Sequence, residues 1–100
     1  MRFNEKVWQK CRLIPKGKVS TYKEIAKSLK TKAYRTIGNA LKKNPYAPKV
    51  PCHRVVNSDG SLGGYKGRLN SMEKIRLLRK EGIKITNGKI IDFRKKIYEF

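Results

Sequence analysis

Residues 21–43, TYKEIAKSLKTKAYRTIGNALKK, decide the fold that this sequence predicts. Thr21 suits the N-cap of a first helix, and Glu24, three positions on, completes a capping box. That helix is expected over about residues 22–29, and a second helix over about residues 33–43. Two short helices joined by a tight polar break are typical of a helix-turn-helix.

The second helix of this pair would be the recognition helix. Its first turn offers the side chains of residues 33–36 to a groove, Arg35 and Thr36 among them. Gly38 and Ala40 are small, which would let the backbone approach DNA or a neighbouring helix closely. A plain three-helix core with a solvated basic face fits the same pattern, and the pattern alone favours neither interpretation.

A further helix is predicted upstream, over residues 3–14. Apolar residues recur on one helical face at Phe3, Val7, Cys11 and Ile14. Cys11 lies on that face, so its expected role is that of a small core hydrophobe rather than a reactive thiol.

Downstream, residues 50–56 read VPCHRVV and hold the only histidine, next to one of the two cysteines. A thiol reacts as its thiolate, whose pKa falls beside a cation, an imidazole or a helix N-terminus. A short helix opening at Pro51 would place Cys52 at its positive end, and the two final valines are expected to form a buried strand. Taken alone, however, a Cys-His pair is more often an ordinary buried thiol beside an ordinary polar contact.

Residues 61–68 carry three glycines around Tyr65, after a strong turn signal at residues 57–60. Such a segment is either a flexible surface loop or a pocket wall in which an aromatic ring stacks on a ligand. It is not a phosphate-binding loop, because neither the Walker spacing nor the dinucleotide spacing is present.

The last third of the chain is predicted to add a helix and a β-hairpin. Asn70 and Glu73 make a capping pair for a helix through Lys80, with a buried stripe of Met72, Ile75, Leu77 and Leu78. Asn87-Gly88 is a strong signal for a two-residue hairpin turn within residues 83–91. The tail is expected to add a last helical turn that packs Phe93, Ile97 and Phe100 on the core.

These elements predict a mainly α single domain over residues 1–100, with a small β component. The fold class is a winged helix-turn-helix-like domain with a C-terminal β-hairpin. The sequence contains no run of about 18 apolar residues, so no membrane span is predicted. It has no apolar segment at its N-terminus, so nothing suggests secretion. The two cysteines are therefore expected to be free thiols.

Charge is the strongest bulk property: 26 Lys and Arg against 7 Asp and Glu give a formal net charge of +19. Such a field attracts polyanions, and nucleic acid suits it better than a membrane surface because no long amphipathic segment pairs a basic face with an aromatic one. The alternative is that the lysines only solubilise the fold, although self-repulsion of this size would destabilise it without a partner.

Pro51-Cys52-His53-Arg54-Val55 resembles the active-site motif of the O6-alkylguanine-DNA alkyltransferases, the methylated-DNA–protein-cysteine methyltransferases. The resemblance runs from about Phe3 to Ile85. Its further segments, in order, are GKVSTY at 17–22, RTIGNAL at 35–41, Asn44-Pro45, Gly64-Tyr65, Leu77-Leu78 and Glu81-Gly82. The resemblance implies the C-terminal DNA-binding and active-site domain of that family, and no N-terminal domain is expected in this chain.

The resemblance also implies a reaction. Cys52 would attack the O6-alkyl carbon of a flipped-out guanine in a single displacement and keep the alkyl group as a thioether. His53 would take the thiol proton through a water, and Glu81 would orient His53. Asn44 would brace the turn around Cys52. No metal or cofactor is expected.

The binding residues follow from the same resemblance. Tyr65 would line the guanine pocket, and the carbonyls of Cys52 and Val55 would accept from the exocyclic amine of the base. Arg35 would enter the base stack where the nucleotide leaves, and Tyr22 would lie against its phosphate. The recognition helix would enter the minor groove. The remaining expected contacts are Thr36, Gly38, Ala40 and Arg54 for DNA, and Lys66 for the pocket.

Two departures from the family pattern concern the pocket. The interval from Tyr65 to Glu81 is about two residues longer, and Lys66 stands where a small or hydroxyl residue is frequent. Glu73 is the only other nearby carboxylate on that helix, and its pairing with His53 would mean that the alignment is shifted.

The predicted function is DNA repair by a single-turnover methylated-DNA–[protein]-cysteine S-methyltransferase. Its partner would be double-stranded DNA containing O6-alkylguanine, bound by a monomer that other repair proteins could join. The expected location is the cytoplasm, on the nucleoid in a prokaryote, or the nucleus in a eukaryote.

Two other functions remain open from the sequence. The first is an alkyltransferase-like lesion sensor, although such proteins carry another residue in place of the cysteine. The second is a helix-turn-helix regulator with an incidental cysteine. A zinc site is disfavoured because Cys11, Cys52 and His53 are too few to close a four-ligand shell.

Overall fold

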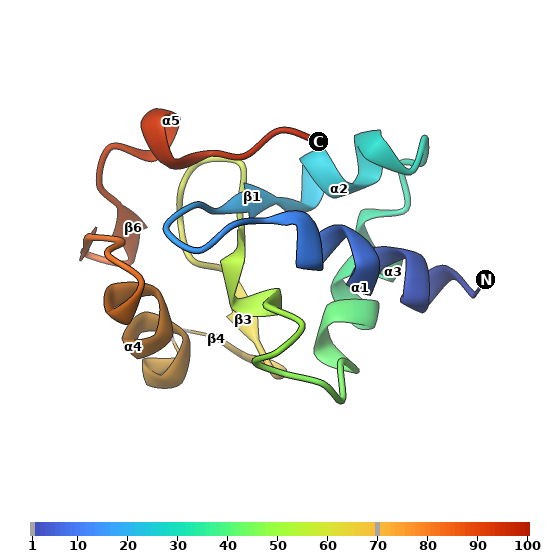
Figure 1. Ribbon diagram of the computed structural model, residues 1–100, viewed down its shortest axis with the longest axis horizontal. Coiled ribbons are helices and arrows are strands. Elements are labelled where there is room, and N and C mark those ends of the chain that lie inside the picture. Colours follow the sequence, from blue (N-terminus) through green and yellow to red (C-terminus); the bar gives the residue numbers. More distant parts are fainter. Residues whose placement is uncertain (1, 70) are drawn as a thin grey trace.

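Three helices build one end of the molecule, at the right of Figure 1: α1 (Phe3–Leu13), α2 (Tyr22–Ser28) and α3 (Tyr34–Lys42). The computed structural model describes residues 2–69 and 71–100. Thr21 caps α2 as predicted, because its hydroxyl accepts from the backbone N–H of Glu24 at 3.0 Å. Both helices of the predicted pair are present, and each ends one residue earlier than expected.

A short parallel strand pair connects this helical end to the Cys-His segment. β1 (Ser20–Thr21) pairs with β2 (Val55–Val56), with Ser20 opposite Val55. The valine strand was predicted, whereas β1 was not. Because β1 runs directly into α2, the pair fixes the start of α2 against the segment that follows Cys52.

Two hairpins follow. The glycine-rich segment forms β3 (Gly64–Tyr65) and β4 (Arg68–Leu69), an ordered antiparallel pair rather than a flexible loop. Its two-residue turn, Lys66-Gly67, has positive φ at both positions, 50° and 79°. The predicted Asn87-Gly88 turn is confirmed between β5 (Ile85–Thr86) and β6 (Lys89–Ile90).

The helix α4 (Met72–Lys80) differs from its prediction in its cap and in its buried face. Ser71 is the N-cap, accepting from the backbone N–H of Lys74 at 3.3 Å, whereas the predicted Asn70 lies outside the described residues. Leu78 and Lys74, one turn apart, are fully buried, but Met72 is 65% exposed. Met72 was wrongly placed in the buried stripe, because it lies about 200° around the helix from Lys74.

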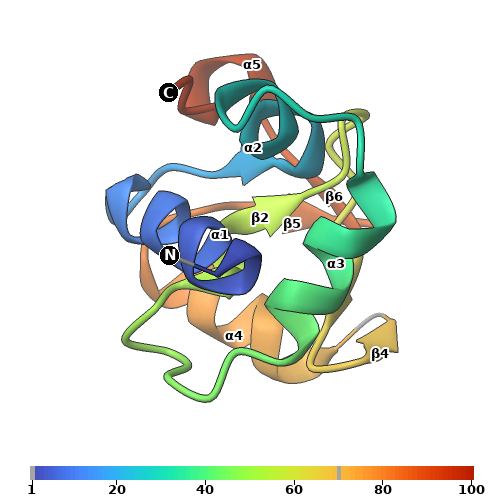
Figure 2. The same ribbon diagram turned by 90° about the vertical axis from the view of Figure 1, so that its right-hand side faces the viewer.

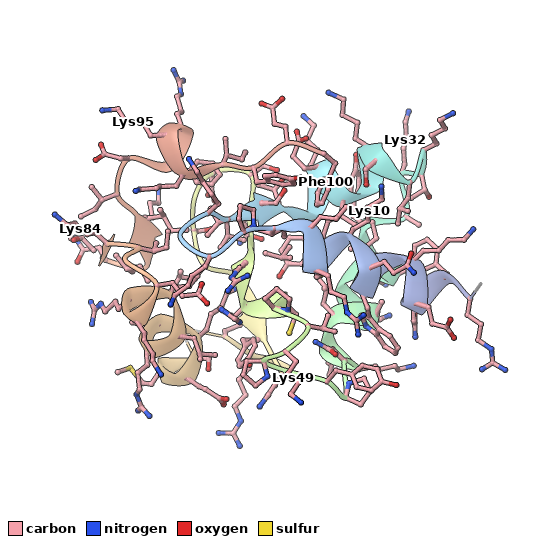
Figure 3. All side chains as sticks on the ribbon, viewed as in Figure 1. Lys10, Lys32, Lys49, Lys84, Lys95 and Phe100 are labelled. Atoms are coloured by element: carbon pink, nitrogen blue, oxygen red, sulfur yellow. The ribbon has the colours of Figure 1, made fainter. Side chains whose placement is uncertain are left out.

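The C-terminal tail packs back on the N-terminal half. A single turn, α5 (Phe93–Lys96), buries Phe93 partly against a second core cluster formed with α4 and the last hairpin. Tyr98 packs on the main core and its N–H donates to the Val19 carbonyl at 2.6 Å. Phe100 lies beside Lys10 of α1, with its ring 5.7 Å from the ammonium nitrogen (Figure 3).

No helix in the part of the chain that the structure describes is long and apolar enough to cross a membrane.

Candidate functional site

Cys52 lines a cavity of about 550 Å³ and is only 5% exposed. It begins a three-residue 3-10 turn, η1 (Cys52–Arg54). The expected helix opening at Pro51 is therefore reduced to one turn that starts a residue later, because Pro51 has a non-helical ψ of 65°. So short a turn has no helix dipole that could lower the pKa of the thiol.

Burial instead raises the pKa of the Cys52 thiol above its ordinary value. A hydrogen bond from the Asn44 side chain, and then the positive charge of Lys74, oppose this effect only in part. The thiol is therefore mostly protonated at neutral pH, and a nearby base must remove the proton before Cys52 can act as a nucleophile.

Asn44 holds the segment that precedes Cys52. Its side-chain amide donates to the Val50 carbonyl at 2.8 Å, and its carbonyl oxygen accepts from the backbone of Tyr46 at 2.9 Å. The Cys52 N–H donates to the same Val50 carbonyl at 2.8 Å. The amide thus closes the loop that delivers the chain to the thiol, in the position expected for a brace.

His53 is paired with Glu81 and not with Glu73. The Nε2 atom of His53 lies 3.0 Å from Oε2 of Glu81. Glu73 instead pairs with Lys66 at 3.1 Å on the exposed surface. The longer interval between Tyr65 and Glu81 therefore does not change which carboxylate pairs with His53, and the sequence alignment is not shifted at Glu81.

The His53–Glu81 pair leaves the other ring nitrogen free to take a proton. A carboxylate only accepts hydrogen bonds, so Nε2 of neutral His53 carries the hydrogen and Nδ1 keeps its lone pair. Nδ1 is buried and has no hydrogen-bond partner within residues 2–69 and 71–100. Burial lowers the pKa of His53, against the opposing influence of Glu81, so the ring is neutral near pH 7.

Arg54 faces inward, which does not match the expected DNA contact. Its Nε and one terminal nitrogen donate to the two oxygens of Glu81 at 2.9 and 2.6 Å, and the other terminal nitrogen donates to the Ile14 carbonyl at 2.8 Å. Although burial raises it, the hydrogen bonds from Arg54 and His53 hold the pKa of Glu81 below its usual range. Arg54 therefore fixes the charged carboxylate behind His53.

The cavity brings together most of the other residues that the sequence singled out. Its lining includes Tyr22, Arg35, Gly38, Cys52, Tyr65 and Lys66. α3 and the β3–β4 hairpin form its two sides, and Figure 2 shows α3 and β4 along the same side of the molecule. Thr36 is exposed but does not line the cavity.

Ala40 lies away from the cavity, and the Val55 carbonyl has a protein donor in addition to the one expected from the base. Ala40 is fully buried on the opposite side of α3, where its carbonyl accepts from the indole of Trp8 at 2.8 Å. Its small size therefore serves the contact with α1 and not an approach to DNA. The Val55 carbonyl already accepts from the Lys74 ammonium at 2.7 Å, which leaves one lone pair for another donor.

Lys74 is a site residue that the sequence did not reveal. Its side chain is fully buried, and its Nζ donates to the carbonyls of Val55, Leu62 and Gly64. Burial lowers its pKa, whereas the three carbonyl acceptors oppose that shift because they favour the charged ammonium. The three bonds connect the strand after Cys52 to the glycine-rich wall of the cavity, and they require the three hydrogens of the ammonium form.

Two tyrosines present hydroxyl groups near the thiol. Tyr65 is buried, with its ring edge-on to His53 at 6.4 Å between centroids, and its hydroxyl has no hydrogen-bond partner in the part of the chain that the structure describes. Burial raises its pKa to about 12, so the hydroxyl stays a donor. Tyr22 lies across the cavity, with its hydroxyl 3.1 Å from the position that a Cβ on Gly63 would take. Because a Cβ at position 63 would be crowded by the Tyr22 hydroxyl, a glycine suits this position.

Residues 2–83 match the family model described as "6-O-methylguanine DNA methyltransferase, DNA binding domain". The chain belongs to this family. A methylated-DNA–protein-cysteine methyltransferase of Methanosarcina barkeri is 43% identical over 83 residues, which cover 82% of this chain and 52% of the relative. A bifunctional methyltransferase/endonuclease of Picrophilus torridus is 49% identical over 78 residues, 77% of this chain and 26% of the relative. The chain thus spans about half, or less, of the length of these curated relatives.

Solved structures of two kinds resemble the fold. S. pombe Atl1, in complex with damaged DNA containing O6-carboxymethylguanine, superposes with a TM-score of 0.85 at 30% identity, covering 100% of both chains. Mycobacterium tuberculosis OGT in complex with DNA gives a TM-score of 0.73 at 40% identity, covering 81% of this chain and 50% of that one. The mainly helical domain with short strands that the sequence predicted is confirmed.

Among residues 2–69 and 71–100, no group of three or more His, Cys, Asp or Glu side chains is arranged to hold a metal ion.

Proposed function

We propose that this protein repairs DNA by moving a methyl or other small alkyl group from O6 of guanine to the sulfur of Cys52, once per molecule. The observation that carries the proposal is that Nδ1 of His53, the chain neighbour of the cavity-lining Cys52, is buried and has no hydrogen-bond partner among the described residues. A nucleophile, a base and an orienting carboxylate are the components of nucleophilic catalysis by cysteine.

The reaction balances with these groups alone. The thiol proton passes to Nδ1 of His53 through an intervening water, and the thiolate attacks the alkyl carbon. A carbon–sulfur bond forms as the carbon–oxygen bond breaks, and the guanine leaves with the electron pair and takes up the proton that the imidazolium of His53 gives back. Glu81, held charged by Arg54, stabilises the imidazolium in the meantime.

The substrate must be flipped out of the helix, because O6 lies inside the base pair and the buried Cys52 lines a cavity. Arg35 and Tyr22 line that cavity from the helical side, which supports the roles of Arg35 in filling the gap in the base stack and of Tyr22 in contacting the phosphate of the flipped nucleotide. The net charge of +19 supports affinity for any duplex. Figure 3 shows lysines such as Lys32, Lys84 and Lys95 projecting from widely separated parts of the surface.

A lesion sensor is the second candidate function. The similarity to Atl1 extends over the whole of both chains, and that structure holds damaged DNA. A sensor of this kind would bind the same flipped base and leave Cys52 unchanged. The presence of Cys52 and of a histidine base next to it supports transfer instead.

Intact-mass spectrometry after incubation with duplex DNA containing O6-methylguanine decides between the two. Transfer predicts a gain of one methyl group per molecule, located on the peptide that contains Cys52 and not on the one that contains Cys11. Selective, tight binding of the lesion with unchanged mass would support the sensor. Equal binding of modified and unmodified duplex together with an unchanged mass would overturn both.

A further inference from the structure

Two large apolar side chains stand exposed at the opening of the Cys52 cavity. Tyr34 is 46% exposed and Leu69 is 79% exposed, and both belong to the lining of that cavity. On a surface dominated by lysine and arginine, exposed apolar side chains that gather at one opening indicate a binding site.

The two side chains come from separate elements on either side of the opening. Tyr34 is the first residue of α3, directly before Arg35. Leu69 ends β4, where its backbone pairs with that of Gly64 in the same hairpin, the cavity wall that faces α3. Neither position depends on a loop: one is fixed by a helix and the other by a strand pair.

The surroundings of these side chains identify the kind of ligand. Lys42, Lys66 and Arg35 line the same cavity, so any ligand that covers the opening meets cations around an apolar centre. A nucleic acid presents the matching surface, with phosphates outside and the faces of bases and sugars inside. Proteins that open a duplex use apolar side chains at the base steps that they unstack, and aromatic rings supply stacking surfaces for unpaired bases.

We propose that Tyr34 and Leu69 form an apolar clamp that holds the DNA open at the lesion. Tyr34 stacks on the base that loses its partner when the guanine is flipped, and Leu69 packs on the deoxyribose of the flipped nucleotide. The clamp rests on the proposed function, because an opened duplex is its ligand. It adds two DNA contacts to the predicted role of Arg35.

The chain offers a matched control for each member of the clamp. Tyr46 is also an exposed tyrosine, but it lies against Trp8, with 5.8 Å between the ring centroids, and does not line the cavity. Leu13 is an exposed leucine at the end of α1, also outside the cavity lining. All four side chains are exposed, so each single substitution leaves the buried core intact.

The test measures binding without transfer, in a Cys52→Ser background. The probe is a duplex in which O6-methylguanine faces a fluorescent cytosine analogue. We expect Tyr34→Ala to weaken binding about 10-fold or more and to abolish the fluorescence change caused by stacking, as is usual when a base loses an aromatic partner. Tyr34→Phe keeps both, and Leu69→Ser weakens binding several-fold. Tyr46→Ala and Leu13→Ser stay within about twofold of the parent, since neither touches the ligand.

Unchanged binding in Tyr34→Ala would overturn the clamp. A Tyr34→Phe variant that binds as weakly as Tyr34→Ala would overturn it too. Neither result affects the proposed function, as long as the parent protein still prefers the lesion. Failure of the unmutated protein to gain a methyl group from this duplex, together with equal binding of modified and unmodified duplex, would overturn the proposed function and the clamp with it. Thermal unfolding of each variant confirms that the fold is retained.

Discussion

The two cysteines occupy opposite kinds of interior. Cys11 is fully buried on α1 among apolar side chains, and burial raises the pKa of its thiol far above the ordinary value. Cys52 is nearly as buried, yet it lines a cavity and has His53 and Asn44 beside it. Burial alone therefore does not distinguish an inert thiol from a nucleophile; Cys52 differs from Cys11 in lining a cavity and in having a histidine as its chain neighbour.

The largest difference in alkyl transfer is expected between variants that lack one thiol or the other. Cys52→Ser should abolish alkyl transfer, because a serine hydroxyl is far harder to deprotonate than a thiol. Cys11→Ala should leave one methyl group transferred per molecule, at the cost of a small core cavity. Intact-mass measurement on both variants provides the test. Loss of transfer in Cys11→Ala, with the fold retained, would contradict the comparison.

Glu81 provides the next largest effect. Glu81→Gln keeps the size of the side chain but removes the negative charge that stabilises the protonated His53, so the single-turnover rate should fall about 100-fold. Glu73→Gln is the matched control. Its ion pair with Lys66 is exposed, and the transfer rate should stay within about twofold. Equal rates for the two variants would exclude Glu81 from the reaction.

Substitution of Lys74 tests whether a nearby positive charge lowers the pKa of the Cys52 thiol. The charge of Lys74 lowers the pKa of Cys52, so Lys74→Met should move the pH profile of Cys52 alkylation by iodoacetamide to higher pH, while Cys11 stays unreactive. The variant also leaves three carbonyls without their donor, which should reduce the free energy of unfolding by about 2 kcal/mol. Urea denaturation measures this loss. An unchanged alkylation profile would remove Lys74 from the site.

The sequence predicted what local patterns determine. Periodic apolar residues located α1, and the hydroxyl of Thr21 located the start of α2. Asn87-Gly88 located the last hairpin because both positions take a positive φ that few other residues tolerate. The ordered motifs of the resemblance also brought Cys52 and Glu81 to one site, although 28 positions separate His53 from Glu81 along the chain.

What the sequence did not predict depends on contacts that form only in the folded chain. β1 is two residues long and exists only through its pairing with β2. Lys74 is a charged residue on a helix, for which exposure is the normal expectation, and only the three converging carbonyls account for its burial. Arg54 sits in a motif of the active site, and nothing in its spacing shows whether it faces DNA or Glu81.

The smallest effect, a shift in pH dependence, separates the role of Glu81 as a charge from its role as a support. Burial lowers the pKa of His53, and Glu81 opposes that shift, so the neutral ring that accepts the thiol proton is already present below the ordinary histidine pKa of about 6.5. The transfer rate should therefore rise with pH along an acidic limb that lies below this value. Glu81→Gln removes an influence that raises the pKa of His53, so the limb should move to still lower pH while the plateau falls. A limb that moves upward, or one that stays in place while the rate falls, would mean that the carboxylate positions the ring without acting on its charge.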